Sequence, residues 1–247
     1  MSPDIAPNIA VERISVIIPV LNEAERIERA IASISPSTHT EVIVVDGGST
    51  DGTIKLVQDL GIQVLSSSAG SPAGRAAQMN IGAAAATGEI VIFLHADTLL
   101  PPGFDVLIRT ALQPSQHPIP IAGAFSLRID APMKRLRWVE RGVNWRSRWL
   151  QMPYGDQAIF LRAEVFEKIG GFPDLSIMED FELIRQLKQL GSIVILPTPV
   201  VTSARRWLQR GVLKTTLINQ LMILGYLLGV NSTRLAQLYR PRNIWRS

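Results

Sequence analysis

The sequence of 247 residues contains no cysteine, which excludes disulfide bonds, zinc–thiolate sites and cysteine nucleophiles. The opening MSPDIAPNIAVERISV has neither a basic start nor a long apolar run, so the sequence predicts no signal peptide. No GxGxxG motif follows a predicted strand, which argues against a dinucleotide-binding oxidoreductase. The lack of cysteine and of a signal peptide favours a cytoplasmic protein, with the inner face of the membrane as an alternative location.

Charge is distributed unevenly along the chain. Residues 1–120 contain 6 Lys/Arg and 12 Asp/Glu, a net charge of −6, whereas residues 121–247 contain 19 and 9, a net charge of +10. We therefore expect a basic C-terminal face that meets an anionic group: a diphosphate, an acidic acceptor or a membrane surface. Nucleic acid has little support, because no nucleic-acid-binding signature accompanies the charge.

Short apolar runs alternate with helical segments in the first half of the chain. This order predicts an α/β fold with a mostly parallel, Rossmann-like sheet and helices on both faces. The predicted strands are Ile14–Val20, Glu41–Val45, Ile62–Ser66, Glu89–Leu94, Ala122–Ile129, Gln157–Leu161 and Ile193–Leu196. The predicted helices are Glu23–Ile34, Thr53–Leu60, Gly74–Ala86, Ala163–Ile169 and Asp180–Leu190. Without repeats or linkers, residues 1–247 are predicted to form a single domain, with a core over about 12–210.

The C-terminal tail, about 211–247, contains a mostly apolar stretch, Val212–Val230. Its uninterrupted apolar part, Leu221–Val230, has only ten residues, whereas a membrane span needs about 20. We therefore expect a helix that packs on the core, lies on a membrane or joins a second subunit in a homodimer.

Three acidic residues lie at, or shortly after, the carboxyl ends of predicted strands. Asp46 ends EVIVVD, Asp97 follows EIVIFLHA, and Glu23 lies just after the first strand. Ligands of open α/β sheets bind outside the carboxyl ends of the strands, so these positions predict a site. In the turn DGGSTDGT, Asp51 has an equally good explanation as a helix cap.

The segment His95-Ala96-Asp97 predicts a metal–diphosphate site. If the segment is extended, residues 95 and 97 point the same way and can face one divalent cation, which would bridge diphosphate oxygens. Asp97 also fits a turn cap, and His95 fits a hydrogen-bonded core residue.

Two further clusters carry charge near predicted element ends. In SIMED, Ser176 and Glu179 have capping-box spacing, whereas Asp180 has no such explanation and fits a general base near a helix N-terminus. In SARRW, two arginines suit diphosphate oxygens, with a solvated basic turn as the alternative.

Taken together, these segments resemble the inverting family 2 glycosyltransferases of GT-A fold. The resemblance covers residues 14–210 and rests on ISVIIPVLNE, EVIVVDGGSTDGT, GRAAQMNIGAAAATGEIVIFLHADT, GDQAIFLRAEVFEKIGGFPD and MEDFEL. It implies transfer of a sugar from a UDP- or GDP-sugar donor to an acceptor hydroxyl, with inversion and with Mn²⁺ or Mg²⁺. HAD, YGDQ and SARRW resemble a small bacterial subgroup often labelled as arsenosugar-biosynthesis glycosyltransferases.

The resemblance also implies roles for individual residues. Asp97 matches the metal ligand of the DxD motif, with His95 as a candidate second ligand, and Asp180 matches the catalytic base. The donor nucleotide would contact Pro19, Asn22, Glu23, Asp46, Asp51, Arg75 and Ala96. The acceptor or diphosphate would contact Gly155, Asp156, Glu179, Arg206 and Trp207.

Two departures from the family pattern matter. His95 replaces the first Asp of DxD, and a nitrogen ligand beside a carboxylate favours manganese, with magnesium as the alternative. Ser203 replaces the Gln of the QxxRW motif found in processive members, and the chain lacks their multiple membrane spans. Both features favour single addition over polymerisation.

Three other functions compete with this interpretation. A sugar-nucleotide-forming nucleotidyltransferase shares the α/β platform, but its basic Gly-rich loop is absent where this chain has PVLNEAER. A non-catalytic sugar-nucleotide-binding protein would not need Asp46, Asp97 and Asp180 together. Tryptophans among the basic residues of 134–148 could stack on nucleic-acid bases, but they suit sugar rings or lipid headgroups equally well.

Overall fold

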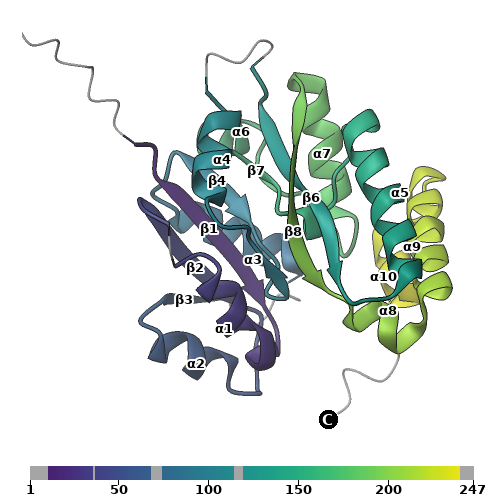
Figure 1. The fold of residues 1–247 in the computed structure, drawn as a ribbon, viewed down its shortest axis with the longest axis horizontal. Helices are drawn as coiled ribbons and strands as arrows, with labels where there is room; N and C mark the ends of the chain where they lie inside the picture. The colour runs from purple at the N-terminus through teal and green to yellow at the C-terminus, as the bar shows by residue number, and fades with distance from the viewer. Residues whose placement is uncertain (1–10, 36, 68–73, 114–118, 240–247) are drawn as a thin grey trace, which may run out of the picture.

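The computed structural model describes residues 11–35, 37–67, 74–113 and 119–239. These residues form one sheet of eight strands, in the spatial order β3-β2-β1-β4-β7-β6-β8-β5 (Figure 1). The strands are β1 (Ile14–Val20), β2 (Thr40–Asp46), β3 (Gln63–Ser66), β4 (Ile90–Phe93), β5 (Thr98–Leu99), β6 (Ala122–Asp130), β7 (Phe160–Arg162) and β8 (Ile193–Ser203). The helices are α1 (Ala24–Ala32), α2 (Thr53–Asp59), α3 (Arg75–Ala85), α4 (Phe104–Ala111), α5 (Lys134–Leu150), α6 (Ala163–Lys168), α7 (Glu179–Leu190), α8 (Arg205–Arg210), α9 (Val212–Leu227) and α10 (Ser232–Tyr239), with a 3₁₀ turn η1 (Gly155–Gln157).

The sheet is mostly parallel, as predicted. Strands β3, β2, β1 and β4 pair in parallel, and β6 pairs in parallel with β8. Strand β7 runs antiparallel to both of its neighbours, β4 and β6, and the short β5 runs antiparallel to β8. The parallel half therefore presents the carboxyl ends of β1, β2 and β4 along one edge.

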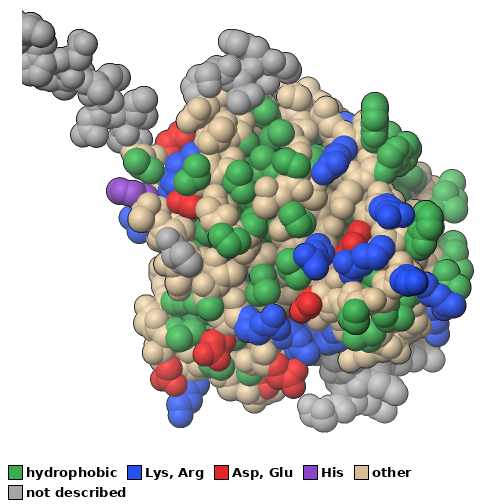
Figure 2. Space-filling view, viewed as in Figure 1, with side chains coloured by type: hydrophobic (Ala, Val, Ile, Leu, Met, Phe, Trp, Pro, Cys, Tyr) green, Lys and Arg blue, Asp and Glu red, His purple; other side chains and the backbone are tan. Residues whose placement is uncertain are grey.

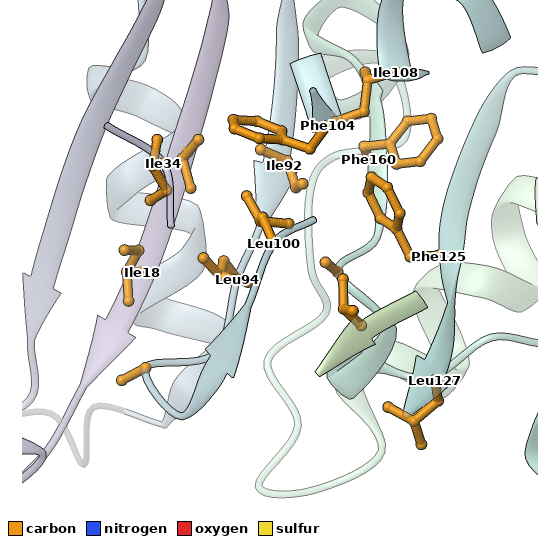
Figure 3. Close-up of a cluster of buried hydrophobic side chains, with 14 of the residues drawn as sticks. Ile18, Ile34, Ile92, Leu94, Leu100, Phe104, Ile108, Phe125, Leu127 and Phe160 are labelled. Atoms are coloured by element: carbon orange, nitrogen blue, oxygen red, sulfur yellow. The ribbon is translucent and has the colours of Figure 1, made fainter. Parts of the chain in front are cut away.

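Helices cover both faces of the sheet, because successive strand residues point to opposite sides. In β1, Val16 and Ile18 belong to one hydrophobic core and Ile17 belongs to the other. The first core receives buried residues from α1, α2, α4, α5, α8 and α9, and the second from α3, α6 and α7. In the first core, the rings of Phe125 and Phe160 pack edge to face with centroids 5.7 Å apart, and Phe104 of α4 belongs to the same cluster (Figure 3).

Three details differ from the predictions. The strand predicted over 157–161 begins only at Phe160, because residues 155–157 form the turn η1. The last strand continues past Leu196 to Ser203, with a register shift in its pairing with β6 between Phe125 and Ser126. The predicted capping box does not form: Met178 occupies the N-cap of α7 without a side-chain cap, and the Ser176 hydroxyl instead lies 3.5 Å from that of Thr233.

The apolar tail forms α9, followed by α10. Within the described ranges, no helix is long and apolar enough to cross a membrane. Helix α9 contacts α5, α8 and α10, so these helices lie together at the end of the molecule beyond β6 and β8 (Figure 1).

Candidate functional site

The loops that follow β1 and β2 interlock at the edge of the sheet. The Asn22 N–H donates to the Ser49 hydroxyl (2.9 Å), and the Thr50 N–H donates back to the Asn22 side-chain oxygen (2.8 Å). Asn22 adopts a left-handed conformation with φ 55°, which asparagine tolerates better than most residues. The predicted nucleotide-binding residues of both loops are thereby brought together and held by each other.

Asp51 joins these loops through its carboxylate. One oxygen accepts the Thr53 N–H (3.1 Å), and the other accepts the Ala24 N–H (3.1 Å) at the start of α1. Partial burial raises the pKa of Asp51, but hydrogen bonds from Thr53 and Ala24 outweigh it, so the pKa lies below its ordinary value. The N-cap of α2 is Gly52, without a side-chain cap, so Asp51 is not the helix cap; its carboxylate instead joins the start of α2 to the start of α1.

Asp46 and Pro19 lie on the strands beneath these loops. Asp46 ends β2, is 3% exposed, and accepts the N–H groups of Gly48 (2.8 Å) and Ser49 (3.1 Å). Pro19 is buried within β1. Below them, the buried Gln78 amide of α3 donates to the carbonyls of Val20 and Val45 (2.8 Å each), which fixes the ends of both strands.

The loop after β4 separates His95 from Asp97. The expectation that this segment is extended is wrong, because the Thr98 N–H donates to the His95 carbonyl (3.0 Å) and closes a turn. Ala96, predicted near the nucleotide, is buried inside this turn. His95 lines one pocket, whereas Asp97 lines another. The predicted alternation therefore does not apply, although both side chains lie near the Arg75 guanidinium.

Asp97 faces the basic segment that follows β8. The Ser203 N–H donates to the Asp97 carbonyl (3.0 Å), so the first residue of α8 lies beside the carboxylate. The Arg205 guanidinium is 3.8 Å from the Asp97 carboxylate and 2.8 Å from that of Glu23. Arg205 thus links the loops after β1 and β4. The sequence analysis named Arg206 for this segment and did not name Arg205.

A metal site made by the protein alone is absent from the described residues, since no three His, Cys, Asp or Glu side chains there could hold an ion together. Metal ions bound with phosphates commonly use only one or two protein carboxylates. Asp97 therefore fits a cation whose remaining ligands are phosphate oxygens and water.

Five of the predicted residues line one pocket: Arg75, His95, Gly155, Glu179 and Asp180. The Asp180 carboxylate accepts the Gly155 N–H (2.7 Å) and the Phe181 N–H (2.8 Å), and it lies in the first turn of α7, where the helix dipole favours a negative charge. Glu179 is buried, and its carboxylate lies 3.6 Å from the Arg75 guanidinium. An ion pair with α3, rather than a capping box, therefore accounts for Glu179.

Gly155, in the loop between α5 and β7, lies against the side chains of His95 and Asp180. A Cβ at this position would lie 3.0 Å from His95 Nε2 and 3.3 Å from Asp180 Oδ2. Burial, together with the cations of Arg75 and Arg206, lowers the pKa of His95 well below its ordinary value. The pocket thus places a neutral imidazole and a carboxylate side by side against one glycine.

Asp156 lies beside this pocket, and its environment is unusual. Within the described part of the chain, its Oδ1 is buried without a hydrogen-bond partner. Burial raises the pKa of Asp156 to about 6; Arg146 opposes the shift, Asp180 adds to it, Arg206 opposes it and Asp97 adds to it. The residue is therefore close to several charges that belong to the predicted site.

The structure brings Arg206 to the site but not Trp207. The cation of Arg206 influences the pKa of both His95 and Asp156, and its guanidinium donates to the Tyr239 hydroxyl. The Trp207 ring is 9% exposed and belongs to the first core. The tryptophan of SARRW thus anchors α8 while the two arginines reach the site.

Sequence reasoning also missed the supports of the loop at 151–157. Gln157 is fully buried; its amide donates to the Phe125 carbonyl (2.8 Å), and its oxygen accepts the Ser147 hydroxyl (2.7 Å). The Arg146 guanidinium stacks on Tyr154, 3.5 Å from the ring centroid. The sequence analysis predicted neither the helix that carries Arg146 and Ser147 nor its contact with this loop.

Residues 15–170 match the family described as Glycosyl transferase family 2. The chain is 39% identical over 95 residues to an uncharacterized glycosyltransferase of Nostoc sp. (strain PCC 7120), a match that covers 36% of this chain and 30% of the relative. It spans about half the length or less of such curated relatives.

Two solved structures share the fold. The mannosyltransferase PcManGT from Pyrobaculum calidifontis, in complex with GDP-Man and Mn²⁺, is 27% identical with a TM-score of 0.60, over 81% of this chain and 60% of that one. Glucosyl-3-phosphoglycerate synthase from Mycobacterium tuberculosis, with Mn²⁺, UDP and glucosyl-3-phosphoglycerate, is 24% identical with a TM-score of 0.56, over 76% of this chain and 71% of that one. The predicted GT-A fold is confirmed by these likenesses, and the match over residues 15–170 shows that the chain belongs to glycosyl transferase family 2.

Proposed function

We propose that the protein transfers a sugar from a nucleotide-diphospho-sugar to an acceptor hydroxyl, with inversion at the anomeric carbon. The observation that carries this proposal is the pocket in which the Gly155 N–H holds the Asp180 carboxylate (2.7 Å) beside His95 and Arg75. Relatives of the same fold bind GDP-Man or UDP, which supports a GDP- or UDP-sugar as the donor.

The nucleotide would bind at the interlocked loops after β1 and β2. The carboxylates of Asp46 and Asp51 accept hydrogen bonds from backbone N–H groups. These two residues would therefore contribute by shaping the loops that receive the base. The diphosphate would lie near Asp97, where Arg205 and Arg75 supply positive charge. Arginine suits this task because its guanidinium donates two parallel hydrogen bonds to phosphate oxygens.

Asp97 is the residue that would hold a divalent cation, Mn²⁺ or Mg²⁺, with His95 turned toward the other pocket. Such a cation would neutralise charge on the leaving diphosphate. Both structures described above contain Mn²⁺, which supports manganese.

Asp180 would act as the general base. Its carboxylate takes the proton of the acceptor hydroxyl as the oxygen forms a bond to the anomeric carbon; the bond from that carbon to the diphosphate breaks, and the nucleoside diphosphate leaves on the opposite face. The two N–H groups that donate to Asp180 fix the direction of its carboxylate. The neutral His95 imidazole beside it can hydrogen-bond the same acceptor.

Ser203 supports single addition rather than polymerisation. In this chain its hydroxyl accepts the Arg205 N–H (3.2 Å) at the start of α8, where processive members of the family have Gln. The likeness to arsenosugar-biosynthesis enzymes stays a prediction.

Replacing Asp180 with Asn tests the base directly. We expect Asp180→Asn to lower the rate of transfer by about 10²–10⁴-fold, the usual contribution of a general base, while donor binding stays nearly unchanged. The measurement is release of UDP or GDP from a panel of nucleotide-sugars with Mn²⁺, and the anomeric configuration of the product by NMR.

Asp174→Asn is the matched control, because Asp174 is exposed in the loop before α7. Its turnover should equal that of the wild type. Full activity of Asp180→Asn, or a product of retained configuration, would remove Asp180 from the proposed role.

A further inference from the structure

Helix α9 is apolar on the side that faces solvent. Among its 16 residues only Val212 and Thr215 are buried. The leucines of one face are between 49% and 76% exposed: Leu213, Leu217, Leu221, Leu224 and, directly after the helix, Leu228. At about 100° per residue these five positions fall within an arc of about 80°, so they form one continuous apolar face.

Helix α5 likewise has large apolar side chains on the side that faces solvent. Its inner side combines Leu136, which is buried in the first core, with polar residues: Glu140 accepts the Ile129 N–H, and the Asn144 side chain exchanges hydrogen bonds with the Leu127 backbone (2.7 and 3.0 Å). Its outer side has three tryptophans, Trp138, Trp145 and Trp149, that are 60–76% exposed. Single exposed apolar residues are ordinary, but contiguous ones on neighbouring helices indicate an interaction surface.

The charges around this surface have one sign. The only acidic residue of α5 is Glu140, which faces inward, and the sequence has no Asp or Glu after Glu182. Exposed basic residues flank the apolar positions on both helices and on α10: Lys134, Arg135, Arg141, Lys214 and Arg234. Figure 2 shows hydrophobic side chains projecting along this edge, with Lys and Arg side chains between them.

We propose that the apolar face of α9 and the tryptophans of α5 dock the protein on an anionic lipid bilayer. Leucines and tryptophans would enter the interface, while the flanking cations would meet acidic headgroups. Helix α9 is about 24 Å long at 1.5 Å per residue, and it would lie in the plane of the membrane. A symmetric dimer through the same face would bring like charges together, because each subunit contributes the same patch.

Vesicle sedimentation tests this docking and does not depend on the proposed transferase reaction. The probes are vesicles of phosphatidylcholine alone and of phosphatidylcholine with phosphatidylglycerol. We expect the full chain to bind the anionic vesicles at least tenfold more tightly, to release them as salt is raised, and to show a blue shift of tryptophan emission when bound.

The variant Leu217→Gln/Leu221→Gln/Leu224→Gln should lose most of this binding. Glutamine keeps helix propensity, and the positions are exposed, so folding should be preserved; circular dichroism and melting temperature check this. Leu60→Gln/Leu190→Gln, at exposed leucines elsewhere, is the matched control and should bind like the wild type.

Two results would overturn the proposal. One is the absence of vesicle binding by a folded monomer. The other is a dimer in analytical ultracentrifugation that the triple variant dissociates and that binds no vesicles, which would assign the face to a second copy. Equal binding to neutral and anionic vesicles would refute the role of charge.

Discussion

The environment of Asp156 differs from that of a free carboxyl group. Its pKa is raised to about 6, first by burial, and the Arg146 and Arg206 cations do not fully offset this. One of its oxygens lacks a hydrogen-bond partner among the described residues. A carboxyl in this state is available to hydrogen-bond a ligand that enters beside Asp180.

Asp156→Asn should change how stability depends on pH. The pKa of Asp156 is about 6 in the folded state, against an ordinary value of 3.8. The folded state therefore binds the proton more tightly than the unfolded state does. The stability that protonation contributes is fully present below about pH 3.8 and is lost as the pH rises through 6. The variant should therefore gain on the order of 1–3 kcal/mol relative to the wild type between pH 4 and pH 8. Urea unfolding at both pH values measures this.

The exposed Asp174→Asn serves again as the control and should show no such trend. A difference between wild type and Asp156→Asn that is the same at both pH values would contradict the raised pKa. The measurement needs no substrate, so it is independent of the proposed reaction.

Sequence reasoning identified the residues of the pocket better than it identified their geometry. Arg75, His95, Gly155, Glu179 and Asp180 were all named, and they line one pocket. Their mutual positions depend on loops: the turn that follows His95 cannot be read from strand periodicity. Likewise, which arginine of SARRW reaches Asp97 is decided by the backbone bond between Ser203 and Asp97.

At the scale of elements, the loop between α5 and β7 helps to form the pocket around Asp180. Gln157 ties this loop to β6 and α5, while the N–H of Gly155, two residues earlier, holds Asp180. The loop is thus fastened at one end in the core and presents its other end to the site. Its rigidity should decide how well Asp180 is oriented.

Gln157→Leu tests this fastening. The substitution keeps the volume but removes the buried amide that donates to the Phe125 carbonyl, a cost of about 1–3 kcal/mol, while the Ser147 hydroxyl keeps the Val143 carbonyl as its acceptor. We expect a lower melting temperature and a lower kcat with little change in donor binding. Gln58→Leu, at an exposed position of α2, should leave both unchanged; an unaltered melting temperature for Gln157→Leu would refute the anchoring role.

The strands of the parallel half could be predicted because each is a short apolar run between turns. The strand β8 could not be predicted in full, because Pro197 and Pro199 interrupt its apolar pattern. The structure accommodates them at the register shift opposite Phe125 and Ser126, and bulges are where proline is tolerated in sheets. Helix α5 escaped prediction because its inner side mixes apolar and polar residues and three tryptophans lie on its exposed side, which obscures the apolar period of a helix.

At the scale of the whole molecule, the site joins two parts of different charge. The acidic first half supplies the loops with Glu23 and Asp97, and the basic second half supplies Arg205, whose guanidinium contacts both carboxylates. We propose that the chain forms a single domain, since α8 and α9 bury residues in the core of the N-terminal strands. A ligand that replaces these ion pairs would link the same two parts.

Donor binding should therefore stabilise the whole protein, and only when metal and nucleotide are present together. Because Asp97 is a single carboxylate without a cluster of further ligands in the described ranges, Mn²⁺ alone should leave the melting temperature nearly unchanged. UDP or GDP with Mn²⁺ at 100 times the dissociation constant should raise it by about 5–10 °C. Asp97→Ala should lose this shift, whereas Asp130→Ala, which removes a carboxylate from the same pocket, should retain it. A comparable shift with Mn²⁺ alone, or an undiminished shift in Asp97→Ala, would mean that the cation is held elsewhere, because a metal bound jointly by Asp97 and the diphosphate needs both.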